Sequence, residues 1–256
     1  MTNKKLRRFF VEEIEAQEGS FSIVGSEAKH ISRVLRMGPG EQFILMDAKG
    51  HRFLALIESI SGREVGITLL ESLPGPSSSP IQIILYQALL KSRQMDYLIQ
   101  KTSELGVDRI LPFISERTVV NLKKDRTDNK LRHWCEIARS AATQSDRVSP
   151  AQIESLSSFK ELMQGARGGN EFKVILWEEE GSKDLKSLLR ASEPWKRLVG
   201  VIGPEGGFSR EEIEAARYSG FIPVSMGRRI LRAETAALTL VAIVQYEWGD
   251  LSLSDS

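Results

Sequence analysis

The sequence predicts an α/β protein with a mainly parallel sheet, preceded by a small β barrel. Residues 81–256 alternate short apolar runs with amphipathic segments, which is typical of strands and helices in a parallel α/β sheet. Residues 1–73 hold short apolar runs separated by turn residues, a pattern that indicates a small barrel. Between them, residues 74–80 are rich in proline and serine and are predicted to form a linker.

The N-terminal domain is expected to hold one helix among short strands. The helix is predicted over residues 25–36, with Ser26 as its N-cap. Apolar runs bounded by turn signals predict strands at residues 42–46, 52–58 and 64–70.

In the C-terminal domain, strands and helices are expected to alternate. The predicted strands are residues 81–86, 109–114, 173–177, 198–202 and 221–225. The predicted helices are residues 95–105, 128–143, 211–219 and 236–248. Ser209 and Glu212 have the spacing of a capping box at the start of the third of these helices. The last helix is mostly apolar and is expected to be buried.

Two loops with glycine, each following a predicted strand, are the main functional signal. One runs from Gly203 to Ser209 and the other from Met226 to Thr235. Glycine lets a ligand approach the backbone, and ligands of parallel α/β sheets bind at the carboxyl ends of the strands. A tight connection would explain either loop alone, but the pair favours a small-cofactor site. Because neither dinucleotide nor phosphate-loop glycine spacing is present, NAD and nucleoside triphosphates are disfavoured.

Composition and charge exclude several classes of protein and of binding site. The single cysteine, Cys135, excludes an internal disulfide, and the three histidines lack the spacing of a metal site, so no metal is predicted. Neither a signal peptide nor a membrane-spanning run is recognised, so a soluble, cytoplasmic protein without a membrane partner is expected. The net charge of +1 makes no global case for nucleic acid.

Local clusters of basic residues suit phosphate groups, although solvated surfaces would also explain them. The clusters are Lys4, Lys5, Arg7 and Arg8; Lys123, Lys124 and Arg126; and Arg228, Arg229 and Arg232. For the second of these clusters, where aspartates are interleaved, phosphate binding and a solvated surface are equally balanced explanations.

Several motifs together resemble one protein family. They are Gly203-Pro204-Glu205-Gly206-Gly207-Phe208-Ser209, Met226-Gly227-x-Arg229-Ile230-Leu231-Arg232-x-Glu234-Thr235-Ala236, Lys101-x-x-Glu104-Leu105-Gly106-Val107, His30-x-x-x-Val34-Leu35-Arg36 and Gln144-Ser145-x-Arg147. The chain thereby resembles, over nearly its whole length, the ribosomal RNA small subunit methyltransferase E family of the SPOUT superfamily. It departs from the family in having Met226 where leucine is more usual and one residue fewer between Arg147 and Pro150.

The resemblance implies both the architecture and the partners. The fold would be a SPOUT-type sheet ending in a C-terminal trefoil knot formed by the two glycine loops. The barrel would be PUA-like and would bind RNA. The partners would be small-subunit ribosomal RNA, in an assembled or assembling subunit, and a second copy of the chain. The apolar last helix supports a homodimer, since it has more apolar surface than one neighbour can cover.

The activity implied by the resemblance is S-adenosylmethionine-dependent methylation of N3 of a specific uridine in 16S ribosomal RNA. The implied cofactor-binding residues are Leu176, Trp177, Ile202, Gly203, Pro204, Glu205, Gly206, Gly207, Met226, Gly227, Arg229, Ile230 and Leu231. Ile230 and Leu231 would sandwich the adenine, whereas Glu205 would bind a ribose or cap a turn. The implied RNA-binding residues are Arg7, Arg8, His30, Arg33, Arg36 and Arg147.

The expected catalytic group is Arg232, Glu234 and Thr235. Arg232 is expected to orient the uridine or its phosphate, because a deprotonated uracil needs a nearby positive charge. Glu234 and Thr235 would hold the loop or the base, and Glu234 is either the general base or an ionised structural group at a helix start.

Two other functions remain open. The loops would equally suit a SPOUT methyltransferase of another RNA, such as transfer RNA or large-subunit RNA. A non-catalytic RNA-binding protein could also keep this fold, although the intact glycines and Arg232 argue against it. A cofactor-binding test separates that alternative from both enzymes.

Overall fold

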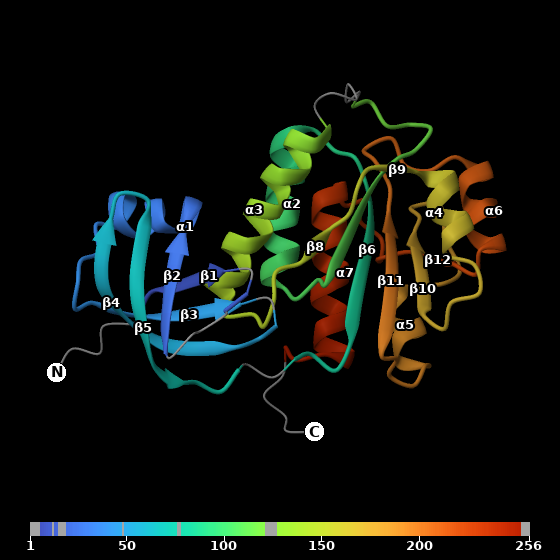
Figure 1. Cartoon of the computed structure of the whole chain (residues 1–256). Coiled ribbons are helices and arrows are strands. Elements are labelled where there is room, and N and C mark those ends of the chain that lie inside the picture. Colours follow the sequence, from blue (N-terminus) through green and yellow to red (C-terminus); the bar gives the residue numbers. More distant parts are fainter. Residues whose placement is uncertain are drawn as a thin grey trace. The chain divides into compact units, whose positions relative to one another are not determined.

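A computed structural model of the chain describes residues 6–11, 13–14, 19–47, 49–75, 78–120 and 127–251 (Figure 1). The chain divides into two compact units. The first comprises the described residues up to Ser78 together with Ala142–Pro150, and the second comprises those in Ser79–Ala141 and from Ala151 onward. The segment Ala142–Pro150 was expected in the C-terminal domain. It lies with the first unit because Arg8 and Arg52 both donate to the carboxylate of Asp146.

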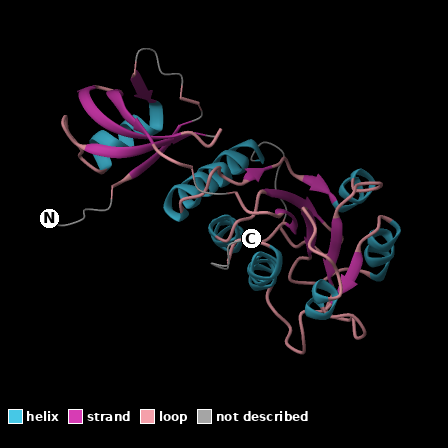
Figure 2. Ribbon diagram, turned by 90° about the horizontal axis from the view of Figure 1, so that it is seen from below, coloured by secondary structure: helices cyan, strands magenta, loops and turns pink. Residues whose placement is uncertain are grey.

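The first unit is a curled five-stranded sheet (Figure 2). Its strands are β1 (Arg8–Val11), β2 (Ser20–Val24), β3 (Gln42–Asp47), β4 (Arg52–Ser61) and β5 (Glu64–Ser72), in the order β1-β3-β4-β5-β2. β1 runs parallel to β3, and the other pairs are antiparallel. Alternate residues of these strands, among them Phe43, Leu45 and Ile57, point inward and build one apolar core.

The helix of this unit differs from the prediction. α1 (Gly25–Lys29) continues into a π-helical turn, η1 (His30–Val34), and Val24, not Ser26, is the N-cap. The helical segment stops before Arg36, whose φ of 51° is left-handed. The backbone N–H of Leu35 donates to the carbonyl oxygen of His30 at 2.9 Å, as a π-turn requires.

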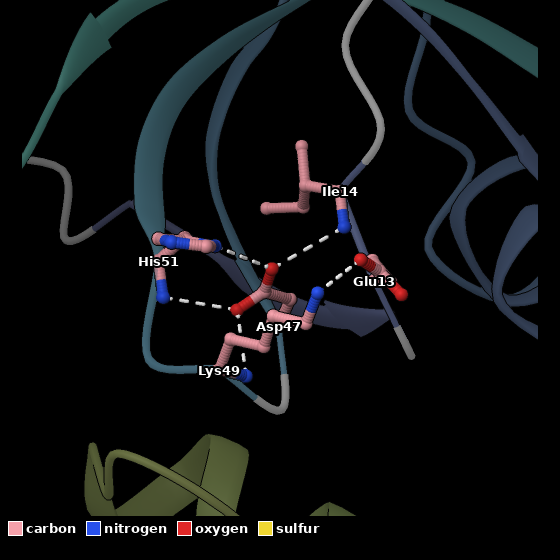
Figure 3. Close-up of polar contacts among 5 residues, drawn as sticks. All are labelled: Glu13, Ile14, Asp47, Lys49 and His51. Carbon is pink, nitrogen blue, oxygen red and sulfur yellow. Dashed lines mark hydrogen bonds and ion pairs between the residues drawn. The ribbon is translucent and has the colours of Figure 1, made fainter.

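Asp47 organises the connection between β3 and β4 (Figure 3). Its buried carboxylate accepts the backbone N–H groups of Ile14 at 3.2 Å, Lys49 at 2.9 Å and His51 at 2.9 Å. His51 Nδ1 lies 2.9 Å from Oδ2 and must donate to the ionised carboxylate. Burial opposes ionisation, but the hydrogen bonds from His51 and Ile14 outweigh it and hold the pKa of Asp47 below its usual value.

The second unit contains a seven-stranded sheet whose pairings are all parallel. Its strands are β6 (Gln82–Ala88), β7 (Arg109–Ile114), β8 (Gln152–Ile153), β9 (Ser157–Ser158), β10 (Phe172–Leu176), β11 (Arg197–Ile202) and β12 (Ile222–Val224). The order is β12-β10-β11-β6-β7-β8, with β9 also paired to β7. The predicted α/β class with a mainly parallel sheet is therefore confirmed, whereas the knot stays a prediction.

Helices cover both faces of this sheet (Figure 1). They are α2 (Ser92–Glu104), α3 (Thr127–Ser145), α4 (Phe159–Gly165), α5 (Leu185–Arg190), α6 (Arg210–Tyr218) and α7 (Ala233–Trp248). α2 and α7 share one apolar core with the sheet, and α4 and α6 share another. The sequence did not predict α4 and α5. Each is a short helix capped by a side chain, from Ser158 and Asp184 respectively.

None of the helices within the described ranges combines the length and the apolar character that crossing a membrane would require.

Candidate active site

A cavity of about 520 Å³ lies at the carboxyl ends of β10, β11 and β12. Both glycine loops contribute to its wall, as do the starts of α2 and α7. Its volume is within the range of about 300–1,000 Å³ that is usual for small-molecule sites. The two loops therefore border one cavity, as predicted, although the strands that they follow, β11 and β12, are separated in the sheet by β10.

The first glycine loop, residues 203–209, is closely packed. The N–H of Gly207 donates to the carbonyl oxygen of Pro204 at 3.0 Å, and Phe208 is buried in the core beneath α4 and α6. A Cβ atom on Gly203 would lie 3.0 Å from the Phe208 ring, and one on Gly207 would lie 2.3 Å from Glu178 Oε1. Gly207 also has a φ of +69°, so its backbone conformation favours glycine.

The predicted capping box at the end of this loop is confirmed. Ser209 is the N-cap of α6, its side chain accepts the N–H of Glu212, and the Glu212 carboxylate accepts the N–H of Ser209. Both residues are buried. The helix start and the end of the loop are thus fixed together.

The second glycine loop, which ends at Arg232 because α7 begins at Ala233, is more open. Gly227 has a φ of +94°, and a Cβ atom there would meet nothing within 4 Å. Ile230 is 88% exposed although it borders the cavity. Arg232 is the N-cap of α7 and makes no side-chain capping hydrogen bond. The exposed Ile230 side chain is available to cover a ligand.

The residues expected to bind a cofactor all line the cavity, except Gly206, which packs against Arg117. Of the expected catalytic group, Arg232 and Glu234 line the cavity and Thr235 does not. Thr235 is exposed one position further along α7, and its carbonyl oxygen accepts the Thr239 hydroxyl at 2.7 Å. The structure therefore brings an arginine and a carboxylate to the cavity and leaves the threonine outside it.

Sequence reasoning missed four charged or polar residues of the cavity wall: Lys91, Gln94, Glu178 and Ser225. Arg228 also lines the cavity, although the sequence analysis named it only as part of a basic cluster. Lys91 and Gln94 come from the start of α2, which follows β6, the neighbour of β11 in the sheet. Since the carboxyl ends of parallel strands meet at one edge, the loop after β6 could have been assigned to the site. Lys91 therefore adds a positive charge to the cavity wall from a segment that is distant in sequence from the arginines of the second loop.

The expected RNA-binding residues differ in their surroundings. Arg7, His30, Arg33 and Arg36 are exposed, and Arg147 is partly buried. The Arg8 guanidinium lies 3.1 Å from Asp146 Oδ2 and is largely buried, so it has a structural ion pair that the sequence did not predict. Lys4, Lys5, Lys123, Lys124 and Arg126 lie outside the described residues.

Within the ranges that the structure describes, no three His, Cys, Asp or Glu side chains are grouped as a metal site would need.

Family models match most of the chain. A model described as an RNA methyltransferase domain matches residues 77–245, and one described as an RNA methyltransferase PUA domain matches residues 23–70. The second match confirms the PUA-like prediction for the N-terminal domain.

Curated relatives agree with these models along nearly their full length. The ribosomal RNA small subunit methyltransferase E of Bacillus subtilis is 30% identical over 94% of this chain and 97% of the relative. The protein of the same name from Mycobacterium tuberculosis is 31% identical over 93% of this chain and 91% of the relative.

Solved structures with bound cofactor have the same fold. A putative methyltransferase from Legionella pneumophila, solved in complex with the cofactor SAM, is 32% identical, with a TM-score of 0.88 over 96% of this chain and 100% of that chain. The ribosomal RNA small subunit methyltransferase E from Neisseria gonorrhoeae, solved with S-adenosylmethionine, is 31% identical, with a TM-score of 0.87 over 96% of this chain and 100% of that chain. Since the models, the relatives and the fold agree over both units, the chain belongs to the ribosomal RNA small subunit methyltransferase E family of RNA methyltransferases.

Proposed function

We propose that the protein transfers a methyl group from S-adenosylmethionine to N3 of one uridine in 16S ribosomal RNA. The observation that carries the proposal is the cavity of about 520 Å³ whose wall combines the backbone of two glycine loops with the cations Lys91 and Arg232. The relatives from Legionella pneumophila and Neisseria gonorrhoeae, both solved with this cofactor, support its choice.

The residues of the cavity fit S-adenosylmethionine. Apolar side chains of Leu176, Ile202 and Leu231 suit the adenine, and exposed peptide groups of the two loops suit its polar edge and the ribose. At Gly227 the space that a Cβ atom would occupy is open, so a ligand can approach the backbone there. The cofactor would be held mainly by main chain and apolar contacts.

The bound cofactor supplies an electrophilic methyl group on a sulfonium. Uracil N3 must lose its proton to attack that group, so the protein has to stabilise a base that becomes anionic. The guanidinium of Arg232 is exposed at the start of α7 and lines the cavity, where it can orient the base or its phosphate. Lys91 lines the same cavity and can provide a second positive charge.

Glu234 lies in the first turn of α7 and borders the cavity. Its carboxylate either holds the second glycine loop or accepts the N3 proton. Thr235 lies outside the cavity, so its role is to support the loop and not to contact the base.

The first unit would hold the RNA. Four residues of this unit are exposed: Arg7 directly before β1, His30 and Arg33 in η1, and Arg36 just after η1. The positive charge of the three arginines suits phosphate groups of the small-subunit RNA. The match to an RNA methyltransferase PUA domain supports this assignment.

A homodimer completes the proposal. An apolar groove runs along α7, lined by Leu238, Ala242, Ile243 and Tyr246, and Tyr246 is 65% exposed. A second copy of the chain would cover this face and bring its own residues near the RNA. Sedimentation equilibrium should give a dimer mass that Ile243→Asp reduces to that of a monomer. A wild-type monomer with full activity would contradict the dimer.

The test of the activity is methyl transfer from radiolabelled S-adenosylmethionine to small ribosomal subunits lacking the modification, with naked RNA in parallel and mass spectrometry of the product. We expect one N3-methyluridine in the small-subunit RNA. Arg232→Ala should lower kcat about 10²- to 10³-fold. Arg210→Ala is the control, because this arginine is 85% exposed on α6 and does not line the cavity.

The other outcomes separate the alternatives. Cofactor binding without transfer to small-subunit RNA would assign the enzyme to another RNA. Absence of cofactor binding would indicate a non-catalytic RNA-binding protein.

A further inference from the structure

The segment after β7, residues 115–120, holds the first glycine loop from outside the cavity. Arg117 Nη1 donates to the carbonyl oxygen of Gly206 at 3.1 Å. A Cβ atom on Gly206 would lie 3.2 Å from Arg117 Cβ and 3.5 Å from the Arg117 carbonyl oxygen. No residue of segment 115–120 is among those that line the cavity. The two segments are therefore in direct contact on the side away from a ligand.

A second attachment joins the same two segments through Glu212. The backbone N–H of Glu116 donates to Glu212 Oε1 at 3.0 Å, and the backbone N–H of Ser209 donates to Oε2 at 3.0 Å. Glu212 is 8% exposed, so its carboxylate is shielded from competing water. One buried carboxylate thus connects segment 115–120 with the end of the glycine loop.

Segment 115–120 is itself folded into a closed turn. The backbone N–H of Ser115 donates to Thr118 Oγ1 at 2.9 Å, and the N–H of Thr118 donates to the Ser115 carbonyl oxygen at 3.1 Å. The turn fixes the backbone from which the Arg117 side chain extends. It can therefore act as a support for a loop that lacks side chains of its own.

The loop needs such support because of its glycines. Gly206 and Gly207 have more conformational freedom in an unrestrained chain than other residues, and a ligand that orders them must offset that entropy. The carbonyl of Gly206 belongs to the same peptide group as the N–H of Gly207, which donates to Pro204. A hydrogen bond from Arg117 to this carbonyl fixes the orientation of the peptide group in the wall of the cavity.

We propose that Arg117 is a positioning residue of the cofactor site, which preorganises the Gly206–Gly207 peptide without touching the cofactor. The proposal rests on the proposed function, since it takes S-adenosylmethionine as the ligand of the cavity. It assigns part of the cofactor affinity to a side chain 89 positions away in the sequence.

Calorimetric titration with S-adenosylmethionine and with S-adenosylhomocysteine tests the proposal. Arg117→Ala should raise both dissociation constants about threefold to tenfold, the effect of one charge-assisted hydrogen bond at an exposed site. Arg117→Lys should give an intermediate value, because lysine keeps one charged donor but lacks the planar fork. Arg210→Ala, the exposed control on α6, should bind like the wild type.

Two further measurements distinguish positioning from catalysis and from general destabilisation. At saturating cofactor and RNA, kcat of Arg117→Ala should stay close to that of the wild type. In the ligand-free protein, hydrogen exchange should become faster at the N–H of Gly207 and should stay unchanged in the middle of α6.

Unchanged dissociation constants and unchanged exchange at Gly207 would overturn the proposal, as would equal acceleration of exchange throughout α6. If the wild type did not bind S-adenosylmethionine, the proposed function would fail. The exchange measurement would still decide whether Arg117 orders the loop, so the two failures are distinguishable.

Discussion

The two glycine loops border one cavity but differ in how the protein holds them. The first loop is attached through Arg117, the Phe208 ring and the buried Glu212 carboxylate. In the second loop, no hydrogen bond joins Met226–Leu231 to other residues in the described part of the chain. The second loop is tied at its start, where Ser225 N–H donates to the Lys183 carbonyl oxygen at 2.9 Å. One wall of the cavity is therefore preformed, and the other is free to adjust to a ligand.

This difference predicts which substitutions affect the stability of the fold and which affect ligand binding. Removing the buried anchor of the first loop, the Glu212 carboxylate, should lower the stability of the fold, because it leaves backbone N–H groups without their acceptor. Changes in the second loop should affect ligand binding with little loss of stability, since its side chains are mostly exposed.

The largest expected effect is that of Glu212→Ala. It leaves the N–H groups of Ser209 and Glu116 without their acceptor and should lower the free energy of unfolding by about 1–3 kcal/mol. Urea denaturation measures the effect. Glu214→Ala on the same helix is the control, because Glu214 is 74% exposed and should change stability by less than about 0.5 kcal/mol. Equal effects of the two variants would show that the first loop is not anchored through Glu212.

Asp47→Asn extends the comparison to the buried carboxylate of the first unit (Figure 3). The amide cannot accept all the hydrogen bonds that Asp47 accepts, so this variant should lose about 1–3 kcal/mol at pH 7. Because the native pKa of Asp47 is lowered, its contribution is complete above the ordinary aspartate pKa of about 3.9 and is lost as the pH falls through the native pKa.

Denaturation of the wild type and of Asp47→Asn at several pH values should therefore show a difference in the free energy of unfolding that becomes smaller at acid pH. Glu58→Gln changes an exposed side chain on β4, and its free energy of unfolding should stay close to that of the wild type. A difference between wild type and Asp47→Asn that is constant down to acid pH would mean that ionisation of Asp47 does not contribute.

Gly227→Ala should have an intermediate effect, through the backbone of the second loop. Its φ of +94° is unfavourable for alanine, so about 1 kcal/mol of stability and part of the cofactor affinity should be lost without any steric clash. Gly181→Ala is a matched control, because a Cβ atom there also meets nothing within 4 Å and its φ is not positive. Thermal unfolding and cofactor titration of both variants would decide whether backbone conformation matters at position 227.

Ile230→Ala should have the smallest effect on the fold and should still weaken binding. The side chain is 88% exposed, so the free energy of unfolding should change by less than about 0.5 kcal/mol. If Ile230 covers the ligand, the dissociation constant of S-adenosylmethionine should rise about threefold or more as apolar contact is lost. Val119→Ala, at a side chain 78% exposed outside the cavity, should alter neither quantity. Unchanged affinity in Ile230→Ala would mean that the second loop stays open when the cofactor is bound.

Local patterns in the sequence were enough for much of the second unit. The strand at residues 109–114, the capping box of Ser209 and Glu212 and the two glycine loops were all predicted, because each depends on residues that are close in the chain. The short elements β1, β2, β8, β9, α4 and α5 were not predicted. They contain too few residues to show a period, and neighbouring elements stabilise them.

Only the tertiary structure placed Lys91 and Gln94 in the cavity wall, paired Arg8 and Arg52 with Asp146, and set Arg117 against Gly206. The sequence by itself determined the two loops, the capping box of α6 and the alternation of strands and helices, since backbone propensity and hydrophobic period act over a few residues. Contacts between residues 89 or 138 positions apart depend instead on strand order and packing, so the folded chain alone decided which cations face the cavity and which are bound as structural ion pairs.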